Sequence, residues 1–142
     1  MTTTRRGKSS QKDCHAYFLQ KIHRAGSARQ AVFISFDEMK ALHVKPSLGH
    51  FKATLIICAR HKQWKTALAL LEEMQQQQRH YHAQPDVMTY NIVLKACAKA
   101  GQWQKAQNLL DEMENHYHHY YVVLRPTVVS YSTVWVACQA GR

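Results

Sequence analysis

Residues Asp86–Met113 read DVMTYNIVLKACAKAGQWQKAQNLLDEM, a pattern typical of two helices joined at a glycine. Asp86 is a cap-forming residue that can accept hydrogen bonds from the free amides of the first helical turn. Gly101 stands where a left-handed residue can end a helix without the steric cost of a Cβ atom. Apolar residues recur at helical spacing on both sides of this glycine: Tyr90, Val93, Leu94 and Cys97 before it, and Trp103, Ala106, Leu109, Leu110 and Met113 after it. Neither helix can bury its apolar face alone, so the pair is one unit of a stack.

The same unit recurs along the chain. A shift of 39 residues aligns it with a preceding copy, and a shift of 41 aligns it with a following one. The aligned residues are mostly identical or similar: Phe51 with Tyr90, Cys58 with Cys97, Trp64 with Trp103, Leu70 and Leu71 with Leu109 and Leu110, Met74 with Met113, Tyr131 with Tyr90 and Pro126 with Pro85. Self-similarity at such a period is typical of repeat proteins. The sequence therefore predicts an all-α fold, an α-solenoid of stacked antiparallel helical hairpins with about three and a half repeats.

The repeats divide the chain into five segments. Residues 1–12 are predicted to form a basic disordered tail or, alternatively, part of a targeting segment. Residues 13–47 are a degenerate repeat, 48–86 a repeat, 87–127 a repeat with an extended second helix or an insertion, and 128–142 a truncated repeat with its first helix only. That half repeat is expected to expose an apolar face, which indicates either a truncated product or a covering partner. The residues of this face are Tyr131, Val134, Trp135 and Cys138.

The expected helices of the first two repeats are His15–Ala25, Gln30–Leu42, Leu48–Arg60 and Trp64–Gln78. Gly26 is expected to end the first of them. The distance from Gly26 to Met39 is one residue longer than that from Gly101 to Met113, so the alignment of the first repeat is open by one position. A proline followed by a cap-forming residue marks each boundary between repeats: Pro46–Ser47, Pro85–Asp86 and Pro126–Thr127.

The composition narrows the classes of partner. The chain of 142 residues has a net charge of +10, and a basic balance favours a polyanionic partner. Three of the four cysteines recur at equivalent positions of successive repeats, which indicates thiols packed between helices rather than disulfides, and hence a reducing compartment. No apolar run reaches the ~18–20 residues needed to cross a bilayer, so no membrane partner is expected.

The repeats resemble pentatricopeptide repeats (PPR), a family of helical hairpins of about 35 residues. The segments that carry the resemblance are Val87–Asn91, Ala96–Gly101, Leu109–Met113, Ala106 and Pro126. The second and third repeats depart from the family pattern because they are 39 and 41 residues long. Their extra residues follow Met74 and Met113.

The resemblance implies a protein that binds single-stranded RNA through the first helix of each repeat, with about one base per repeat. It also implies a role in organellar RNA processing, stability or translation and a mitochondrial or plastid location, with the cytoplasm as an alternative. The base-reading pairs that it implies are Lys52 with Asp86 and Asn91 with Thr127, while Ser132 lacks its partner. Asn91 would favour a pyrimidine, and Lys52 and Asp86 could instead form an ion pair.

Further positions follow from the same resemblance. Met88 and Val129 would flank the bases as apolar side chains. Candidates for phosphate contacts follow instead from their place on the first helices: Lys95 lies four residues after Asn91 on the same face, and Arg60 and Lys99 are equivalent across repeats, so binding would depend on salt concentration. The alternative for these three residues is a solvated helix face.

Two histidine clusters, His80–Tyr81–His82 and His116–His119, lie after the second helices of successive repeats. A metal site is one hypothesis, but a polar, aromatic helix extension is preferred because the spacing is unlike that of zinc sites. We predict no metal, no cofactor and no enzyme, since no nucleophile–base pair or phosphate loop is present in the sequence. The alternatives to RNA binding are a scaffold subunit of a larger ribonucleoprotein, whose other proteins would cover the last helix, and a metal-dependent enzyme built on the histidines.

Overall fold

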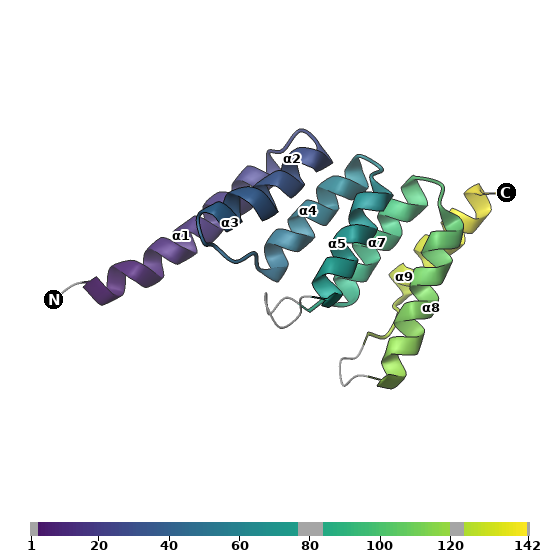
Figure 1. The fold of residues 1–142 in the computed structure, drawn as a ribbon. Helices are drawn as coiled ribbons and strands as arrows, with labels where there is room; N and C mark the ends of the chain where they lie inside the picture. Colours follow the sequence, from purple (N-terminus) through teal and green to yellow (C-terminus); the bar gives the residue numbers. More distant parts are fainter. Residues whose placement is uncertain (1–2, 77–83, 120–123, 142) are drawn as a thin grey trace.

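The helices of the chain lie side by side along one axis, with the two termini at opposite ends (Figure 1). The computed structural model describes the backbone of residues 3–76, 84–119 and 124–141, and the side chains of residues 12–76, 84–115 and 124–141. In order, the elements are α1 (Thr3–His23), α2 (Ala28–Phe33), the π-helix η1 (Ile34–Glu38), α3 (Met39–Ala41), α4 (Leu48–Arg60), α5 (Trp64–Gln76), α7 (Val87–Lys99), α8 (Trp103–His119) and α9 (Val128–Ala140). The predicted α-solenoid of stacked hairpins is confirmed.

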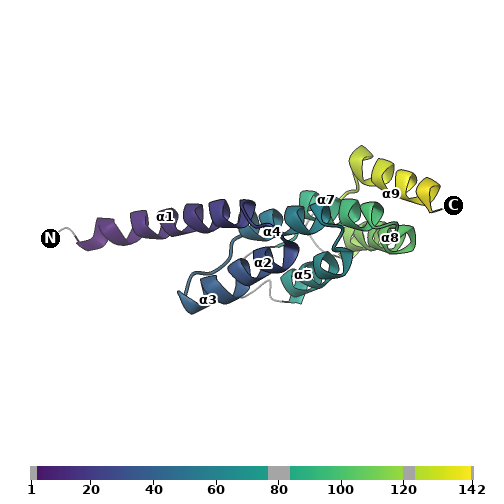
Figure 2. The same cartoon turned by 90° about the horizontal axis from the view of Figure 1, so that it is seen from above.

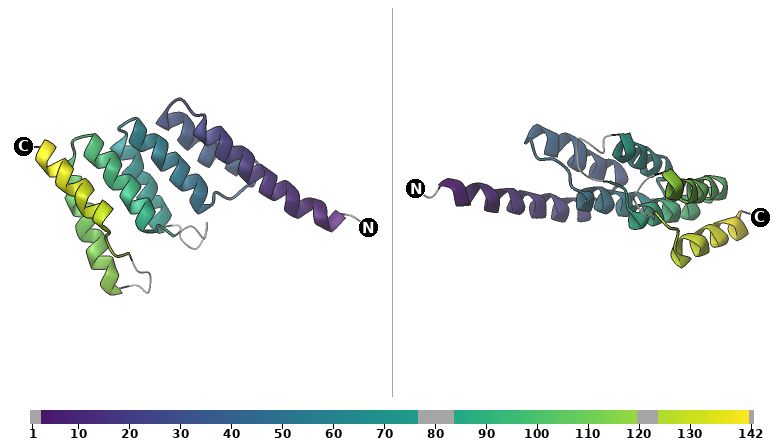
Figure 3. Two further views of the ribbon diagram at one scale, coloured as in Figure 1. Left: turned by 180° about the vertical axis from the view of Figure 1, so that it is seen from behind. Right: turned by 90° about the horizontal axis from the view of Figure 1, so that it is seen from below.

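The stack has two layers (Figures 2 and 3). The first helices of the repeats, α1, α4, α7 and α9, follow one another in one layer, and α2, α3, α5 and α8 lie in the other. Within the first layer α4 packs against α1 and α7, and α7 packs against α9. Each second helix also contacts the first helix of the following repeat, as α5 does with α7 and α8 with α9. Residues at the same place in successive repeats therefore form a row along one surface.

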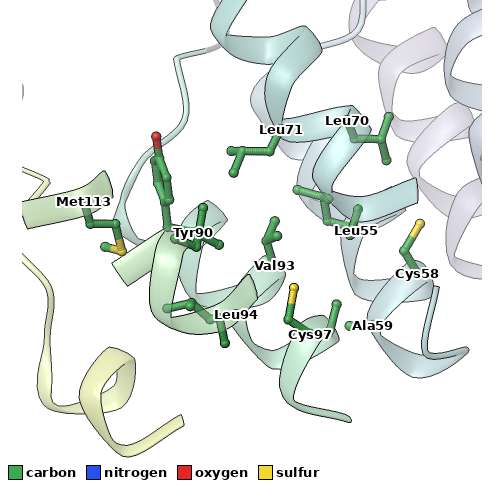
Figure 4. Packing of buried hydrophobic residues seen from close by; sticks show 14 of the residues in the cluster. Leu55, Cys58, Ala59, Leu70, Leu71, Tyr90, Val93, Leu94, Cys97 and Met113 are labelled. Atoms are coloured by element: carbon green, nitrogen blue, oxygen red, sulfur yellow. The ribbon is translucent and has the colours of Figure 1, made fainter. Parts of the chain in front are cut away.

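The apolar pattern of the sequence becomes the core between the layers. Figure 4 shows Tyr90, Val93, Leu94 and Cys97 of α7 among residues of α4, α5 and α8. Each of these four α7 side chains is buried, and burying one side chain as large as leucine contributes about 1.5–3 kcal/mol. The Tyr90 hydroxyl accepts a hydrogen bond from the Gln75 amide at 2.8 Å, and burial raises the pKa of Tyr90 to about 12.

The predicted turn after α7 is confirmed, and the second repeat makes the same turn with a different residue. Gly101 adopts a left-handed φ of +73°. Lys62 occupies the equivalent place after α4 with a φ of +58°, although its side chain makes this conformation costly. The expectation for Gly26 is wrong, because α1 ends at His23 and Gly26 has no positive φ.

The second helix of the first repeat differs from the single helix predicted over Gln30–Leu42. It consists of α2, the π-helical turn η1 and α3 in succession. A π-helical turn accommodates one extra residue in a helix. The extra residue between Gly26 and Met39 is absorbed there, and Met39 reaches a fully buried position in the core of this repeat.

The backbone of the N-terminal segment is helical from Thr3, so α1 includes residues 3–12. A disordered tail or part of a targeting segment was expected over residues 1–12; the helix does not fit a disordered tail, and the targeting segment stays a prediction. Arginine, lysine and glutamine are favourable helix formers, and no proline interrupts the segment, so the helix of residues 13–23 can continue toward the N-terminus. Among the described residues, no helix is both long enough and apolar enough to cross a membrane.

Candidate nucleic-acid interface

The three residues that follow the helix aromatics form one row across the first layer. Lys52 of α4, Asn91 of α7 and Ser132 of α9 each stand one residue after Phe51, Tyr90 or Tyr131. The aromatic side chain points into the core of the complete repeats, and the next residue turns about 100° around the helix toward the surface. Lys52 and Asn91 are half-buried and Ser132 is exposed. Burial of the aromatic residue in each repeat therefore places the following residue on the surface at the same position of each first helix.

Lys52 and Asp86 form an ion pair between successive repeats. The Lys52 Nζ lies 2.6 Å from the Asp86 Oδ2, and 21% of the lysine side-chain surface is exposed. The other carboxylate oxygen of Asp86 accepts the backbone N–H of Thr89 at 2.8 Å and so caps α7. Burial works to raise the pKa of Asp86, but the hydrogen bonds from Lys52 and Thr89 outweigh it and hold the pKa below its ordinary value. The carboxylate is therefore charged, and each of its oxygens has a partner within the protein.

Asn91 and Thr127, the second predicted pair, are also brought together, and here the contacts are neutral. The Asn91 amide donates to the Thr127 Oγ1 at 3.4 Å, a long contact, and its oxygen accepts from the Ser130 Oγ at 2.5 Å. Ser130 in turn accepts the backbone N–H of Thr127 at 3.0 Å. The amide nitrogen carries a second N–H, which gives a ligand a neutral donor at this position.

Ser130 is one of three buried polar residues that the sequence analysis missed. His50, Thr89 and Ser130 each stand at the third position of a first helix, and each side chain accepts a hydrogen bond from the backbone N–H of the cap residue. The signal was present in the sequence, because each residue follows its cap former by three positions, as in a capping box. The pattern is easily overlooked because Glu or Gln usually takes this position.

Leu19 is the member of the row in the first repeat. Phe18, Ile22 and Ala25 are buried at the spacing that Phe51, Leu55 and Cys58 have in the second repeat, so Leu19 corresponds to Lys52. The Leu19 Cδ2 lies 3.9 Å from the position that a Cβ atom on Gly49 would take, which places it beside the start of α4. An aliphatic side chain makes no hydrogen bond, so this position cannot read a base edge as the family pair would. This position could not be identified from the sequence, because two alignments of the first repeat, one residue apart, were possible.

The predicted flanking and phosphate-contact residues are exposed. Met88 and Val129 occupy equivalent places on α7 and α9 and have exposed side chains, while Gly49 at the matching place of α4 has none. Arg60, Lys95 and Lys99 are exposed as well. The places on α4 and α9 that correspond to Lys95 hold Ile56 and Val136, so the positive charge does not recur in every repeat. Their roles toward RNA stay predictions.

The cysteines and the histidine clusters are the remaining candidates for reactive or metal-binding groups. Cys58 and Cys97 are buried, and burial raises the pKa of each thiol to about 11. Within the described part of the chain, no group of three or more metal-ligating side chains is close enough to hold an ion. His80–His82 lies outside the described residues, and only the backbone of His116–His119 is described, where α8 extends. The extended second helix predicted for the third repeat is thus present up to His119.

Comparison with known proteins identifies the repeats. The sequence model described as the PPR repeat family matches residues 85–138, and the one described as PPR repeat matches residues 51–78. The chain belongs to the pentatricopeptide repeat family. Members of this PPR family generally bind single-stranded RNA and are non-catalytic. No curated protein matches the chain. The matched ranges include Lys52, Asn91 and Ser132, so the row of surface residues lies within the recognised repeats.

Proposed function

We propose that this PPR chain binds single-stranded RNA across α4, α7 and α9, with Asn91 as its main base contact. The observation that carries the proposal is the row of Lys52, Asn91 and Ser132 at one register of three successive helices. Unstacked bases of single-stranded RNA offer their edges to such a row, and helical repeats that read one base each use this arrangement. Asn91 with Thr127 presents a neutral amide donor at the centre of the row.

The two pairs have different chemistry toward a base. Lys52 presents a cation whose charge is partly neutralised by Asp86, while Asn91 presents an amide. A base in front of Asn91 is contacted through an acceptor on its edge, such as a pyrimidine oxygen. The apolar side chains of Met88 and Val129 flank the bases that contact α7 and α9. The third repeat, through Asn91, therefore contributes most of the selectivity among RNA bases.

Binding of labelled single-stranded RNA, measured by fluorescence anisotropy at several salt concentrations between about 50 and 200 mM, tests the proposal. A pyrimidine-rich oligonucleotide is expected to bind more tightly than duplex DNA of equal length. Absence of binding at the lowest salt concentration, or equal affinity for duplex DNA, would contradict RNA binding. The variant Asn108→Ala, on the exposed side of α8 in the opposite layer, is the matched control for Asn91→Ala.

The salt dependence tests the phosphate contacts. Arg60, Lys95 and Lys99 are exposed on the first layer, and each phosphate contact contributes about 0.7 to the slope of log K against log salt concentration for a single strand. Lys95→Ala is expected to reduce the slope by about this amount. Lys105→Ala on α8 should leave the slope unchanged, and an equal reduction in both variants would show that only the net charge matters.

The family resemblance extends the proposal to a place of action. We propose a role in RNA processing, stability or translation in a mitochondrion or plastid. Localisation of the tagged protein in cells tests this part, and a cytoplasmic distribution would contradict it.

The second candidate function is a scaffold subunit of a ribonucleoprotein. It is favoured by the exposure of α9, where Trp135 is 66% exposed and Tyr131 is 48% exposed. Instability of the purified chain, with folding restored by a partner protein and without RNA affinity, would favour the scaffold.

A further inference from the structure

The contact between α1 and α4 contains two neighbouring histidines, His50 buried and His15 half-buried, that the proposed RNA binding does not use. The side chain of His50, at the third position of α4, is fully buried. Its ring centroid lies 5.0 Å from that of His15 on α1. The Nδ1 atom of His15 is itself buried and has no hydrogen-bond partner. The two histidines therefore lie between the first and second repeats, and neither forms an ion pair with an acidic side chain of the described residues.

The hydrogen bonds of His50 fix its protonation state. Its Nδ1 accepts the backbone N–H of Ser47 at 3.1 Å, so this nitrogen carries no hydrogen. Its Nε2 lies 3.1 Å from the carbonyl oxygen of His15, which can only accept, so Nε2 carries the hydrogen. The neutral ring thus closes the cap of α4 with one nitrogen and holds α1 with the other.

Protonation removes one of these two contacts. A hydrogen on Nδ1 would face the backbone N–H of Ser47, and two donors cannot bond to each other. The Ser47 hydroxyl, 2.7 Å from Nδ1, can turn to accept the new hydrogen, but the backbone N–H cannot. The cap of α4 would lose a bond while a cation became buried beside a second imidazole, which is costly. Burial lowers the pKa of His50, and the hydrogen bond to His15 offsets part of this effect.

The surrounding charges do not offer compensation. Among the described residues, His15 is the titratable group whose charge acts on His50, and it disfavours the protonated form. Glu38 of η1 is paired with Lys21 at 2.5 Å, and Asp86 is paired with Lys52 of α4. The other charged or titratable groups of the elements that pack around α4 are Lys12, Asp13, Cys14, Tyr17, His23 and Arg24 on and after α1, Arg29 on α2, Asp37 on η1, His43 and Lys45 before α4, Lys65, Glu72 and Glu73 on α5, and Tyr90, Lys95, Cys97 and Lys99 on α7.

The carbonyl group of His50 ties a third element to this contact. Thr54 donates its hydroxyl to the His50 carbonyl oxygen at 2.9 Å, so Ser35 must be the donor in the buried Ser35–Thr54 hydrogen bond. Ser35 belongs to the π-helical turn η1. A change at His50 therefore reaches both helices of the first repeat.

We propose that the α1–α4 contact is a proton-sensitive joint, at which protonation of His50 releases the first repeat while the rest of the stack stays folded. The other two repeat junctions provide the internal comparison, because Thr89 and Ser130 make the same capping contact with hydroxyls that do not titrate. The stability that the neutral histidine provides is complete above the unfolded pKa of about 6.5 and is lost as the pH falls toward the lower folded pKa.

Hydrogen exchange of the full chain, expressed as protection factors between about pH 7.5 and 5, tests the joint. The protection of α1 residues 13–23 is expected to fall by up to about tenfold per pH unit in the window between the two pKa values, with that of α7 unchanged. His50→Thr, which gives α4 the same third-position hydroxyl that Thr89 provides in α7, should remove the difference, and His61→Gln, at an exposed histidine after the same helix, should retain it. An equal loss of protection in α1 and α7, or a loss that persists in His50→Thr, would overturn the proposal.

An NMR titration of the histidine rings decides the question independently if His50→Thr does not fold. His50 is expected as the Nε2–H tautomer with a pKa below the ordinary histidine value. A ring that titrates at or above that value while α1 keeps its protection would rule out the joint.

Discussion

The helices α7 and α9 occupy the same place in successive repeats, yet only α7 has its own second helix packed on it. Tyr90, Leu94 and Cys97 of α7 are buried, with α8 packed on this helix. Their counterparts Tyr131 and Trp135 are exposed, and Cys138 is half-buried. The prediction that Val134 is exposed is wrong: its counterpart Val93 lies beside Leu55 and Leu71 of the preceding repeat (Figure 4), and Val134 is buried like Val93.

The difference separates two sources of burial in a repeat. One side of each first helix is covered by the preceding repeat and is complete in both α7 and α9. The other side depends on the second helix of the same repeat and is complete only in α7. α9 contains no charged residue, and a helix that is apolar on most sides is typical of a buried position. Stability in a solenoid is approximately a sum over repeats and their interfaces. Equivalent residues of α7 and α9 should therefore contribute differently to the free energy of unfolding, because their burial differs.

The largest effect is expected from shortening Leu94. Leu94→Ala should lower the free energy of unfolding by about 2–5 kcal/mol, because it leaves a cavity between α7 and α8. Trp135→Ala, at the equivalent place on α9, should change it by no more than about 0.5 kcal/mol because the indole is exposed. Urea denaturation followed by circular dichroism measures both. Similar losses in the two variants would show that α9 is covered in solution.

The thiols give the next comparison. Burial raises the pKa of Cys97 to about 11, which leaves about a hundredfold less thiolate than a thiol with the ordinary pKa of 9.0 would have. We expect alkylation of Cys97 to be slower than that of Cys138, because Cys97 is buried and Cys138 is half-buried, as followed at each site by mass spectrometry. Cys58, which is buried in the same way, should behave like Cys97. Equal rates at Cys97 and Cys138 in the native chain, with equal rates also in denaturant, would contradict the packing.

Most of the fold could be predicted from the sequence, because residues that begin or end a helix act on their immediate neighbours in the chain. The repeat spacing, the proline-and-cap boundaries and the glycine turn predicted α4 with its observed limits and α9 from Val128, because a cap, a stop and an apolar face coincide there. The first repeat was harder to predict because its helices are shaped by packing. The π-helical turn that brings Met39 into the core has no cap or proline to mark it.

The candidate interface could be predicted in part. The row of Lys52, Asn91 and Ser132 follows from its place after each aromatic residue, and the structure brings both complete pairs into contact. The orientation of the Asn91 amide could not be predicted, because it depends on Ser130, a buried hydroxyl 39 residues away. Contacts of this kind depend on how one repeat is placed on the next.

Substitutions of Asp86 test the ion pair that joins Lys52 of α4 to the start of α7. Asp86→Ala removes both the cap of α7 and the ion pair with Lys52, and should cost about 1–2 kcal/mol of unfolding free energy. Asp86→Asn keeps a capping oxygen and should cost less than about 1 kcal/mol, since the ion pair is partly exposed.

The pH dependence of Asp86→Asn has a defined sign. The folded pKa of Asp86 is lowered, so its charge stabilises the chain above the unfolded pKa of about 3.9, and this contribution disappears as the pH falls through the folded value. The difference from the natural chain should therefore shrink on acidification in thermal melts. A difference that stays constant to the lowest pH would show that the charge has no role.

The smallest effect is expected from the uncharged contacts between α7 and α9, in which Asn91 bonds to Thr127 and Ser130. Asn91→Ala removes one amide donor from the proposed RNA surface and should weaken binding of pyrimidine-rich RNA by about fivefold to tenfold, equivalent to about 1 kcal/mol for one hydrogen bond. Ser130→Ala keeps the Asn91 amide but removes the hydrogen bond that orients it. This variant should therefore weaken RNA binding less than Asn91→Ala does, and should reduce the preference for pyrimidines. Because both variants also alter the junction between α7 and α9, their unfolding free energies are measured in parallel. Loss of RNA affinity in proportion to loss of stability would assign Asn91 to packing, whereas loss of affinity at unchanged stability would assign it to base contact.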